Sequence, residues 1–222
     1  MRPPAAEPLQ LAGEAGALEV LLEVPAAAIA SAFAVICHPH PLHGGTLHNK
    51  VVHTLARTCH ERGWPTLRFN YRGVGASEGG FDDGRGETED ALSVIRWGQQ
   101  RFPQRPLLLA GFSFGAMVAL RAAARAPVRR LITVAPAVTH PGFEGIGAPA
   151  CPWLIIQGGA DEVVAPQAVV AFATRFAAAA QLRLLPDVGH FFHGRLDELR
   201  RVAGEFLDAD PLSPLHVSPP QN

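Results

Sequence analysis

The sequence predicts an α/β domain in which a mostly parallel central sheet of about eight strands is flanked by helices on both faces. Short apolar runs of strand length alternate with segments of helical periodicity along the chain. The runs at 107–110 and 154–156 are apolar throughout, which is typical of strands that helices bury on both faces. No repeat of about 20 to 50 residues is found, which excludes solenoids and propellers.

The N-terminal part predicts strands before it predicts a helix. A weak strand is expected at 9–12, and Pro25 separates two apolar runs of strand length at 20–24 and Phe33–Cys37. Apolar residues recur at spacings of three and four over 47–62, which indicates a helix. Gly63 follows at the position where helices commonly end in a left-handed backbone.

Alternation continues to the end of the chain. We expect further strands at Thr66–Phe69, 107–110, 130–135, 153–157 and 182–185. We expect further helices at 87–101, 114–125, 167–178 and 195–207. A length of 222 residues suits one domain, assigned to 1–210, with a Pro- and Ser-rich C-terminal tail at 211–222.

Composition limits the class of partner. The chain is 48% hydrophobic and 18% charged, and 19 basic residues balance 20 acidic ones for a net charge of −1. Such a balance argues against nucleic-acid binding, because no basic excess exists to neutralise phosphates. No apolar run reaches the roughly 18 residues of a membrane span. The oligomeric state, monomer or homodimer, stays open.

The cysteines and the N-terminal region bear on the compartment. Three scattered cysteines, Cys37, Cys59 and Cys151, suit buried thiols in a reducing compartment rather than a disulfide framework. The apolar stretch 25–37 follows glutamates instead of lysines, which is the wrong flank for a secretory signal. We expect a cytoplasmic protein.

The pentapeptide Gly111-Phe112-Ser113-Phe114-Gly115 lies between a predicted strand and a predicted helix. In G-x-S-x-G a sharp strand-to-helix turn exposes the serine hydroxyl, and the N–H of the next residue faces the same point. The bare pattern is common, but its context favours a nucleophilic serine over an incidental one. We expect Ser113 to be the nucleophile and the Phe114 N–H to stabilise an oxyanion.

A nucleophilic serine needs a base and an acid that orients the base. His190 follows the strand predicted at 182–185, whereas most of the ten histidines precede the serine. Asp161 follows the strand at 153–157 on a tight glycine turn. Asp187 is nearer to His190 in sequence but is interpreted as a turn residue. We therefore assign His190 as the base and Asp161 as the acid.

The order Ser113, Asp161, His190 on an alternating strand–helix chain resembles the α/β-hydrolase superfamily. The chain is most similar to small lidless bacterial members, related to dienelactone-hydrolase-like and prolyl-oligopeptidase-like esterases, over about residues 15 to 208. A turn of similar R-G-x-G-x-S type, Arg72 to Ser77, is also found in the family. We interpret it as structural, with its glycines forming the turn and Arg72 and Ser77 bracing it.

The resemblance also implies where the second oxyanion donor lies. Relatives usually carry His-Gly-x after the strand that corresponds to Phe33–Cys37, and the residue after the glycine donates. Here the loop reads His38-Pro39-His40-Pro41-Leu42. Because proline has no N–H, His40 is the first choice and Leu42 the second.

Two further features surround the expected site. The histidines of this loop do not suggest a metal site, because prolines stiffen it and no acidic residue is near. The segment 135–152, where a lid is usually inserted in this fold, is short. We expect an open site lined by Phe191 and Val138, with Phe112 and Phe192 packed in the core.

These inferences predict a serine hydrolase that cleaves small to medium carboxylic esters and needs no cofactor. A thioesterase or another acyl hydrolase would use the same residues, since the fold does not fix the substrate. A non-catalytic binding module on the same fold is the alternative from a different class of protein. The intact set of Ser113, Asp161 and His190 argues against it, because binding alone would not require all three.

Overall fold

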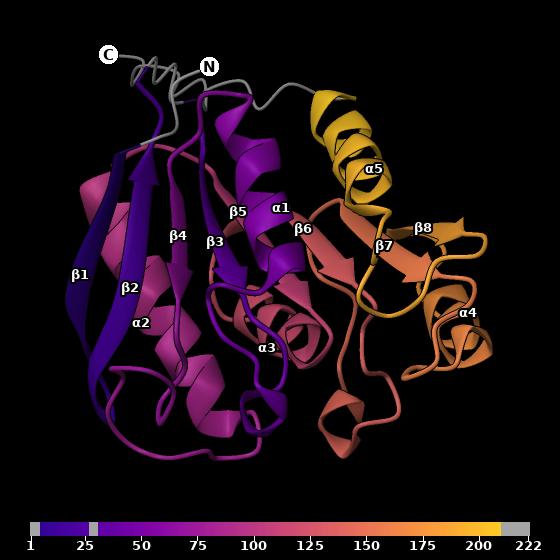
Figure 1. Cartoon of the computed structure of the whole chain (residues 1–222), viewed down its shortest axis with the longest axis horizontal. Helices are drawn as coiled ribbons and strands as arrows, with labels where there is room; N and C mark the ends of the chain where they lie inside the picture. Colours follow the sequence, from indigo (N-terminus) through magenta and orange to yellow (C-terminus); the bar gives the residue numbers. More distant parts are fainter. Residues whose placement is uncertain (1–4, 27–30, 210–222) are drawn as a thin grey trace, which may run out of the picture.

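The computed structural model describes residues 5–26 and 31–209 of the chain. In this part of the chain, eight strands form one sheet in the order β1-β2-β4-β3-β5-β6-β7-β8 (Figure 1). The strands are β1 (Ala5–Gly13), β2 (Gly16–Val24), β3 (Phe33–Cys37), β4 (Thr66–Phe69), β5 (Leu107–Phe112), β6 (Val128–Val134), β7 (Trp153–Gly158) and β8 (Ala180–Leu185). The α-helices are α1 (Lys50–His60), α2 (Arg85–Arg101), α3 (Phe114–Ala123), α4 (Pro166–Thr174) and α5 (Leu196–Asp208). The expected tail at 211–222 lies outside the described residues.

The sheet is parallel from β4 through β3 to β8, and antiparallel only where β1 and β2 join it. The predicted mostly parallel sheet is therefore confirmed. The first strand, expected at 9–12, extends over Ala5–Gly13 because it pairs along its whole length with β2 in a hairpin. Such cross-strand pairing depends on a partner segment, so a prediction from the local sequence alone made the strand too short.

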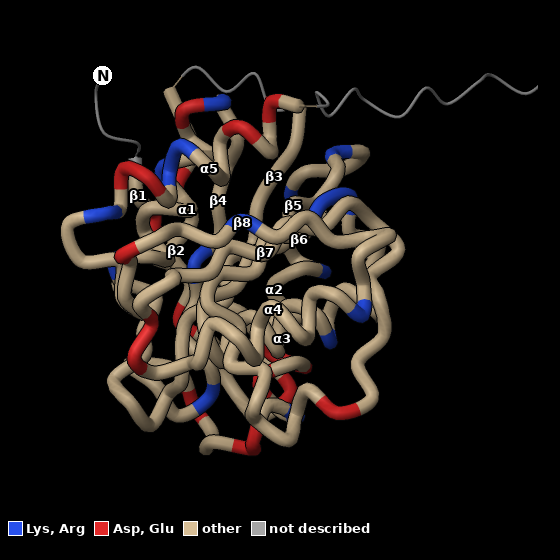
Figure 2. The backbone as a smooth tube through the Cα atoms, turned by 90° about the vertical axis from the view of Figure 1, so that its right-hand side faces the viewer, with Lys and Arg blue, Asp and Glu red and all other residues tan. Residues whose placement is uncertain are grey.

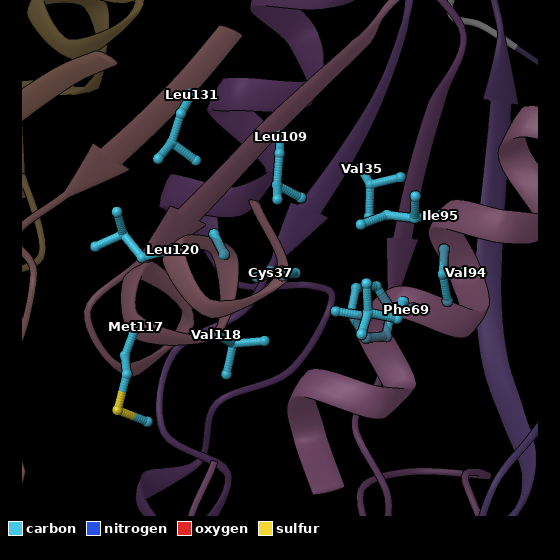
Figure 3. Packing of buried hydrophobic residues seen from close by; sticks show 14 of the residues in the cluster. Val35, Cys37, Phe69, Val94, Ile95, Leu109, Met117, Val118, Leu120 and Leu131 are labelled. Carbon is cyan, nitrogen blue, oxygen red and sulfur yellow. The ribbon is translucent and has the colours of Figure 1, made fainter. Parts of the chain in front are cut away.

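Two hydrophobic layers cover the two faces of the sheet. Side chains alternate across a strand, so Val35 and Leu109 join the core beneath α2, α3 and α4. Ile36 and Ala110 join the core beneath α1 and α5. Figure 3 shows Val35 of β3 beside Ile95 of α2 in the first of these layers. Helices on both faces, as predicted, explain why these strands read as continuous apolar runs.

The first helix shows how local sequence sets its ends. Asn49 precedes α1, and its Oδ1 accepts hydrogen bonds from the N–H groups of Val51 at 2.9 Å and Val52 at 3.4 Å. This side-chain cap satisfies donors that have no partner within the helix. It also explains why α1 begins at Lys50 rather than at residue 47. Gly63 has a φ of 73°, the left-handed conformation expected after the helix.

The turn after β4 is braced as the sequence predicted. The guanidinium of Arg72 binds the fully buried carboxylate of Asp90 in α2, with N–O distances of 2.8 and 3.1 Å. The Ser77 hydroxyl donates to the Asn70 carbonyl at 2.8 Å and accepts the Glu19 N–H at 2.9 Å. These bonds tie the turn to α2 and to β2, which supports its interpretation as a structural element.

The carboxyl ends of the parallel strands meet at one edge of the sheet, and little covers that edge. Between β6 and β7 the described chain forms only a single 3₁₀ turn, Pro141–Phe143, so no lid domain is inserted at this point (Figure 1). Acidic and basic residues are interspersed along the described chain (Figure 2). None of the helices in the described ranges is long and apolar enough to cross a membrane.

Candidate active site

Ser113 lies in the sharp turn between β5 and α3. Its backbone has φ 56° and ψ −116°, a conformation that residues other than glycine adopt only where the surrounding structure fixes it. The Ser113 N–H donates to the carbonyl of Val134 in β6 at 2.9 Å, which helps to fix it here. A strained backbone at a serine in a strand-to-helix turn is typical of a side chain held for reaction.

The glycines two residues on either side of Ser113 permit the turn. A Cβ on Gly111 would collide with the Gly115 carbonyl, and a Cβ on Gly115 would collide with the carbonyls of Cys37 and His38. The backbones of β5, α3 and the end of β3 therefore approach each other more closely than any side chain allows. The G-x-S-x-G spacing has this steric cause, and it brings the loop after β3 against the start of α3.

The three residues selected from the sequence form one hydrogen-bonded chain. His190 Nε2 lies 3.1 Å from Ser113 Oγ, and His190 Nδ1 lies 2.9 Å from Asp161 Oδ2. With the carboxylate ionised, Nδ1 carries the proton and donates to it, so Nε2 has a free lone pair for the serine hydroxyl. All three side chains are largely buried, with residue exposures of 8%, 7% and 2% for Ser113, Asp161 and His190.

The Asp161 carboxylate has a hydrogen-bond partner on every side. Oδ1 accepts the N–H groups of Val163 at 2.9 Å and Val164 at 2.7 Å, while Oδ2 faces Gln157 Nε2 and His190, each at 2.9 Å. Burial alone raises the pKa of this carboxyl, but the hydrogen bonds from His190 and Val164 outweigh it and lower the pKa below its ordinary value. Asp161 is therefore held ionised next to the imidazole.

His190 lies in the loop after β8 and is fixed mainly by residues of other elements. Its N–H donates to Glu162 Oε2 at 3.2 Å, and its ring lies 5.0 Å from the ring of Phe112 and 5.0 Å from that of Phe191. Asp187, between β8 and His190, has a φ of 55° and lies in the turn, as expected from the sequence. The histidine is thus restrained by two aromatic rings and a backbone hydrogen bond, while Nε2 lies within hydrogen-bond distance of the serine.

His38 restrains the loop that follows β3. Its Nε2 accepts the Tyr71 N–H at 3.1 Å, so the proton must be on Nδ1, which donates to the Pro39 carbonyl at 2.7 Å. Burial lowers the pKa of His38 to about 3, and the bond to Pro39 offsets only part of this effect. The ring is therefore neutral, and it holds the Pro39 carbonyl on one side of the loop.

This arrangement sets the direction of the His40 N–H. In a trans peptide the C=O and N–H point in opposite directions, so the N–H of His40 points away from His38. No acceptor for it is found among residues 5–26 and 31–209. The Leu42 N–H instead donates to His40 Nδ1 at 3.2 Å. Phe114 opens α3, so its N–H has no intrahelical acceptor.

The apolar residues expected at or near the site differ in exposure. Phe112 and Phe192 are fully buried, and Phe114 is nearly so, whereas Phe191 is 42% exposed beside the His190 ring. Val138 is half-buried in the loop after β6 and packs against the core. Leu42, in the loop after β3, is also exposed, at 68%.

In the described part of the chain no three His, Cys, Asp or Glu side chains are placed to hold a metal ion. Within the histidine-rich loop, both ring nitrogens of His38 are already engaged by the Tyr71 N–H and the Pro39 carbonyl. The loop is therefore organised by hydrogen bonds to its own backbone and to the turn after β4.

Sequence reasoning missed Gln157. This fully buried residue near the end of β7 donates from Nε2 to Asp161 Oδ2 at 2.9 Å, and its Oε1 is one of the few buried polar atoms without a partner in the described structure. A polar residue that ends the apolar run of β7 was the available signal. Its partner was not predictable, because the bond depends on the turn that follows the strand.

Known proteins share this arrangement of elements. A family model described as alpha/beta hydrolase fold matches residues 41–146. The solved structure of an alpha-beta serine hydrolase homologue from Coxiella burnetii is 45% identical, covers 90% of this chain and 97% of its own, and superposes with a TM-score of 0.87. An uncharacterised protein of Rickettsia prowazekii is 32% identical over 184 residues, 78% of this chain and 77% of that protein.

A further solved structure, from Xanthomonas campestris, is described as a member of the α/β serine hydrolases without a lid. It is 41% identical, covers 94% of this chain and 96% of its own, and has a TM-score of 0.88. Identity and coverage of this size, together with the sheet order and the strained serine turn, show that the chain belongs to the α/β-hydrolase superfamily.

Proposed function

We propose that the protein is a serine hydrolase that cleaves small to medium carboxylic esters through an acyl-enzyme on Ser113. The observation that carries the proposal is the chain of hydrogen bonds from Ser113 Oγ through His190 to Asp161, at 3.1 and 2.9 Å. A serine hydroxyl is a weak nucleophile until a base takes its proton. This geometry supplies the base in the required tautomer.

In the proposed reaction, Ser113 Oγ attacks the ester carbonyl while His190 Nε2 takes the hydroxyl proton. The Asp161 carboxylate stabilises the imidazolium that forms. The N–H groups of Phe114 and His40 donate to the oxyanion of the tetrahedral intermediate. Two geometric facts support this pair: the Leu42 N–H is engaged by His40 Nδ1, and the Pro39 carbonyl is turned toward His38.

Collapse of the intermediate breaks the ester C–O bond, and the leaving alkoxide takes the proton from His190. A water molecule then attacks the acyl-enzyme, with His190 again acting as base, and releases the acid and free Ser113. Membership of the hydrolase superfamily supports this class of reaction. The absence of a lid in the described structure and the exposed Phe191 favour esters that approach from solvent over long acyl chains that need a covered groove.

Labelling with a fluorophosphonate probe tests the proposal. The wild-type protein should be modified at Ser113 and should hydrolyse p-nitrophenyl acetate and butyrate, while Ser113→Ala should do neither. Circular dichroism of both proteins controls for folding. A folded wild-type protein that is neither labelled nor active would overturn the proposal and favour a non-catalytic binding module. Turnover of acyl thioesters in preference to matched oxygen esters would instead assign a thioesterase.

A further inference from the structure

Two adjoining cavities lie next to the loop that carries His190. The first, about 280 Å³, is lined by Phe191 and His193 at one end and by His48 and Lys50 at the other. The second, about 440 Å³, shares His48 and Lys50 and continues between α1 and α5 to Arg57 and Arg200. The two cavities adjoin at these shared residues, and together they are called here the α1–α5 groove. Their volumes are those of a site for a small ligand.

The groove begins beside the proposed base. Phe191 lines its first cavity, and the Phe191 ring lies 5.0 Å from the ring of His190. In a serine hydrolase the leaving group receives its proton from this histidine, so it departs on the histidine side of the scissile bond. The groove is lined by residues that directly follow His190 in the chain. It is therefore placed to receive the leaving alcohol or thiol rather than the acyl group.

The walls of the groove are cationic. Lys50, Arg57 and Arg200 line the larger cavity, against one carboxylate, that of Asp197. Glu61 lies 3.4 Å from Arg57 and 2.7 Å from Arg200, and Asp197 lies 3.2 Å from Arg200, so these two guanidiniums are partly neutralised.

Lys50, in contrast, has no ion-pair partner among the described residues. It is the only lysine of a chain whose net charge is −1. His48 and His53 line the same cavity. The groove therefore carries a local excess of positive charge. Lys50, the cation that no carboxylate of the described residues neutralises, lines both cavities.

We propose that the α1–α5 groove binds a phosphate group carried by the leaving alcohol or thiol of the substrate. This proposal rests on the proposed esterase function at Ser113. Cationic side chains around a cavity match a phosphate, whose several oxygens accept charge-assisted hydrogen bonds from more than one donor at once. The start of α1 is not the binding element, because the Asn49 side chain already accepts the N–H groups of Val51 and Val52.

Acetyl esters with three similar leaving alcohols test the proposal. Hydrolysis of the acetyl ester releases neutral glycerol from monoacetylglycerol, the carboxylate-bearing alcohol glycerate from 3-O-acetylglycerate, and glycerol 3-phosphate from 1-acetylglycerol 3-phosphate. We expect kcat/KM for the phosphate ester to exceed that for the neutral ester by about tenfold, with the carboxylate ester between them, as for a charge-assisted contact of moderate strength. Raising the salt concentration should reduce this preference, since salt screens exposed charges.

Variants locate the effect. Lys50→Gln should reduce the ratio of kcat/KM for the phosphate ester to that for the neutral ester by about fivefold, the size expected for one exposed ionic contact. Arg183→Gln is the matched control, because it removes one exposed positive charge from β8, outside the groove. It should leave the ratio as in the wild-type protein.

Each result decides for or against the groove. Equal turnover of the phosphate and neutral esters, a preference for the carboxylate, or equal effects of Lys50→Gln and Arg183→Gln would overturn the phosphate site while the esterase function stands. Failure to label Ser113 or hydrolyse any ester would instead reject the esterase function. Calorimetric titration with glycerol 3-phosphate then tests phosphate binding in the groove independently of hydrolysis. Binding weakened by Lys50→Gln supports a phosphate site, and no binding by the wild-type protein overturns it.

Discussion

Gln157 Nε2 donates to Asp161 Oδ2 at 2.9 Å, and the same oxygen accepts the proposed hydrogen bond from His190 Nδ1 at 2.9 Å. The Gln157 amide also lies within 3.4 Å of the Val164 carbonyl, which holds it in place. Gln157 therefore fixes the rotation of the carboxylate that orients the histidine. It acts on the proposed reaction only through Asp161, so it is a positioning residue.

Replacing Gln157 with leucine should lower kcat by about tenfold with little change in KM. A hydrogen bond to a charged group contributes about 1.5 to 3 kcal/mol, and its loss lets the carboxylate rotate away from His190 without touching the substrate. Steady-state kinetics on p-nitrophenyl acetate measure both parameters. Gln157→Glu places a second carboxylate beside Asp161 and should lower kcat further. An unchanged kcat in both variants would contradict the positioning role.

Replacing Ser113 with glycine should abolish hydrolysis and yet raise the free energy of unfolding by about 1 kcal/mol. The strained conformation at φ 56° and ψ −116° is accessible to glycine, and relief of about 1 to 3 kcal/mol of strain exceeds the entropic cost of glycine. Ser113→Ala is the matched control, since it loses the nucleophile but keeps a Cβ. In urea denaturation, the free energy of unfolding should be higher for Ser113→Gly than for the wild-type protein and for Ser113→Ala. Equal stability of the two variants would show that the turn is not strained.

Replacing Gly115 with alanine should disrupt the loop after β3 and lower kcat/KM by at least a hundredfold. The new Cβ would meet the backbone carbonyls of Cys37 and His38, which cannot move aside as a side chain would. Displacing these atoms shifts the proposed His40 donor, and loss of one oxyanion donor alone costs about a hundredfold or more. Ala116→Gly, one residue later in α3, controls for a general effect on the helix. A kcat/KM near the wild-type value in Gly115→Ala would mean that the loop after β3 can shift to make room for the new Cβ.

Much of this fold follows from local sequence, and the exceptions have a common cause. The apolar runs that became β3, β5 and β7 are readable because helices bury both of their faces, and Asn49 and Gly63 mark the ends of α1. The order of Ser113, Asp161 and His190 was sufficient to select three residues that the structure brings together. The length of β1 was underestimated because it depends on pairing with β2. The role of Gln157 was missed because its hydrogen bond to Asp161 depends on the path of the turn after β7.

Stability should fall on acidification partly because His38 is buried without charge. Its pKa is about 3 in the folded protein, against an ordinary value of 6.5. Above pH 6.5 neither state binds the proton, so His38 adds no penalty there. Between pH 6.5 and 3 the unfolded chain binds a proton that the folded protein excludes, so stability decreases as pH falls. This single group should lower the free energy of unfolding by about 3 kcal/mol between pH 7 and pH 4.

The variant His38→Asn isolates this effect. Asparagine retains a donor near the Pro39 carbonyl but does not titrate, so the variant should be less stable at pH 7 and lose less stability on going to pH 4. Urea denaturation at half-unit pH intervals compares the two curves. Other histidines contribute equally to both proteins, so the difference between the curves belongs to position 38. Parallel curves would mean that His38 accepts a proton in the folded protein. The Tyr71 N–H would then have lost its acceptor, and the loop that orients the His40 N–H would no longer be held by the turn after β4.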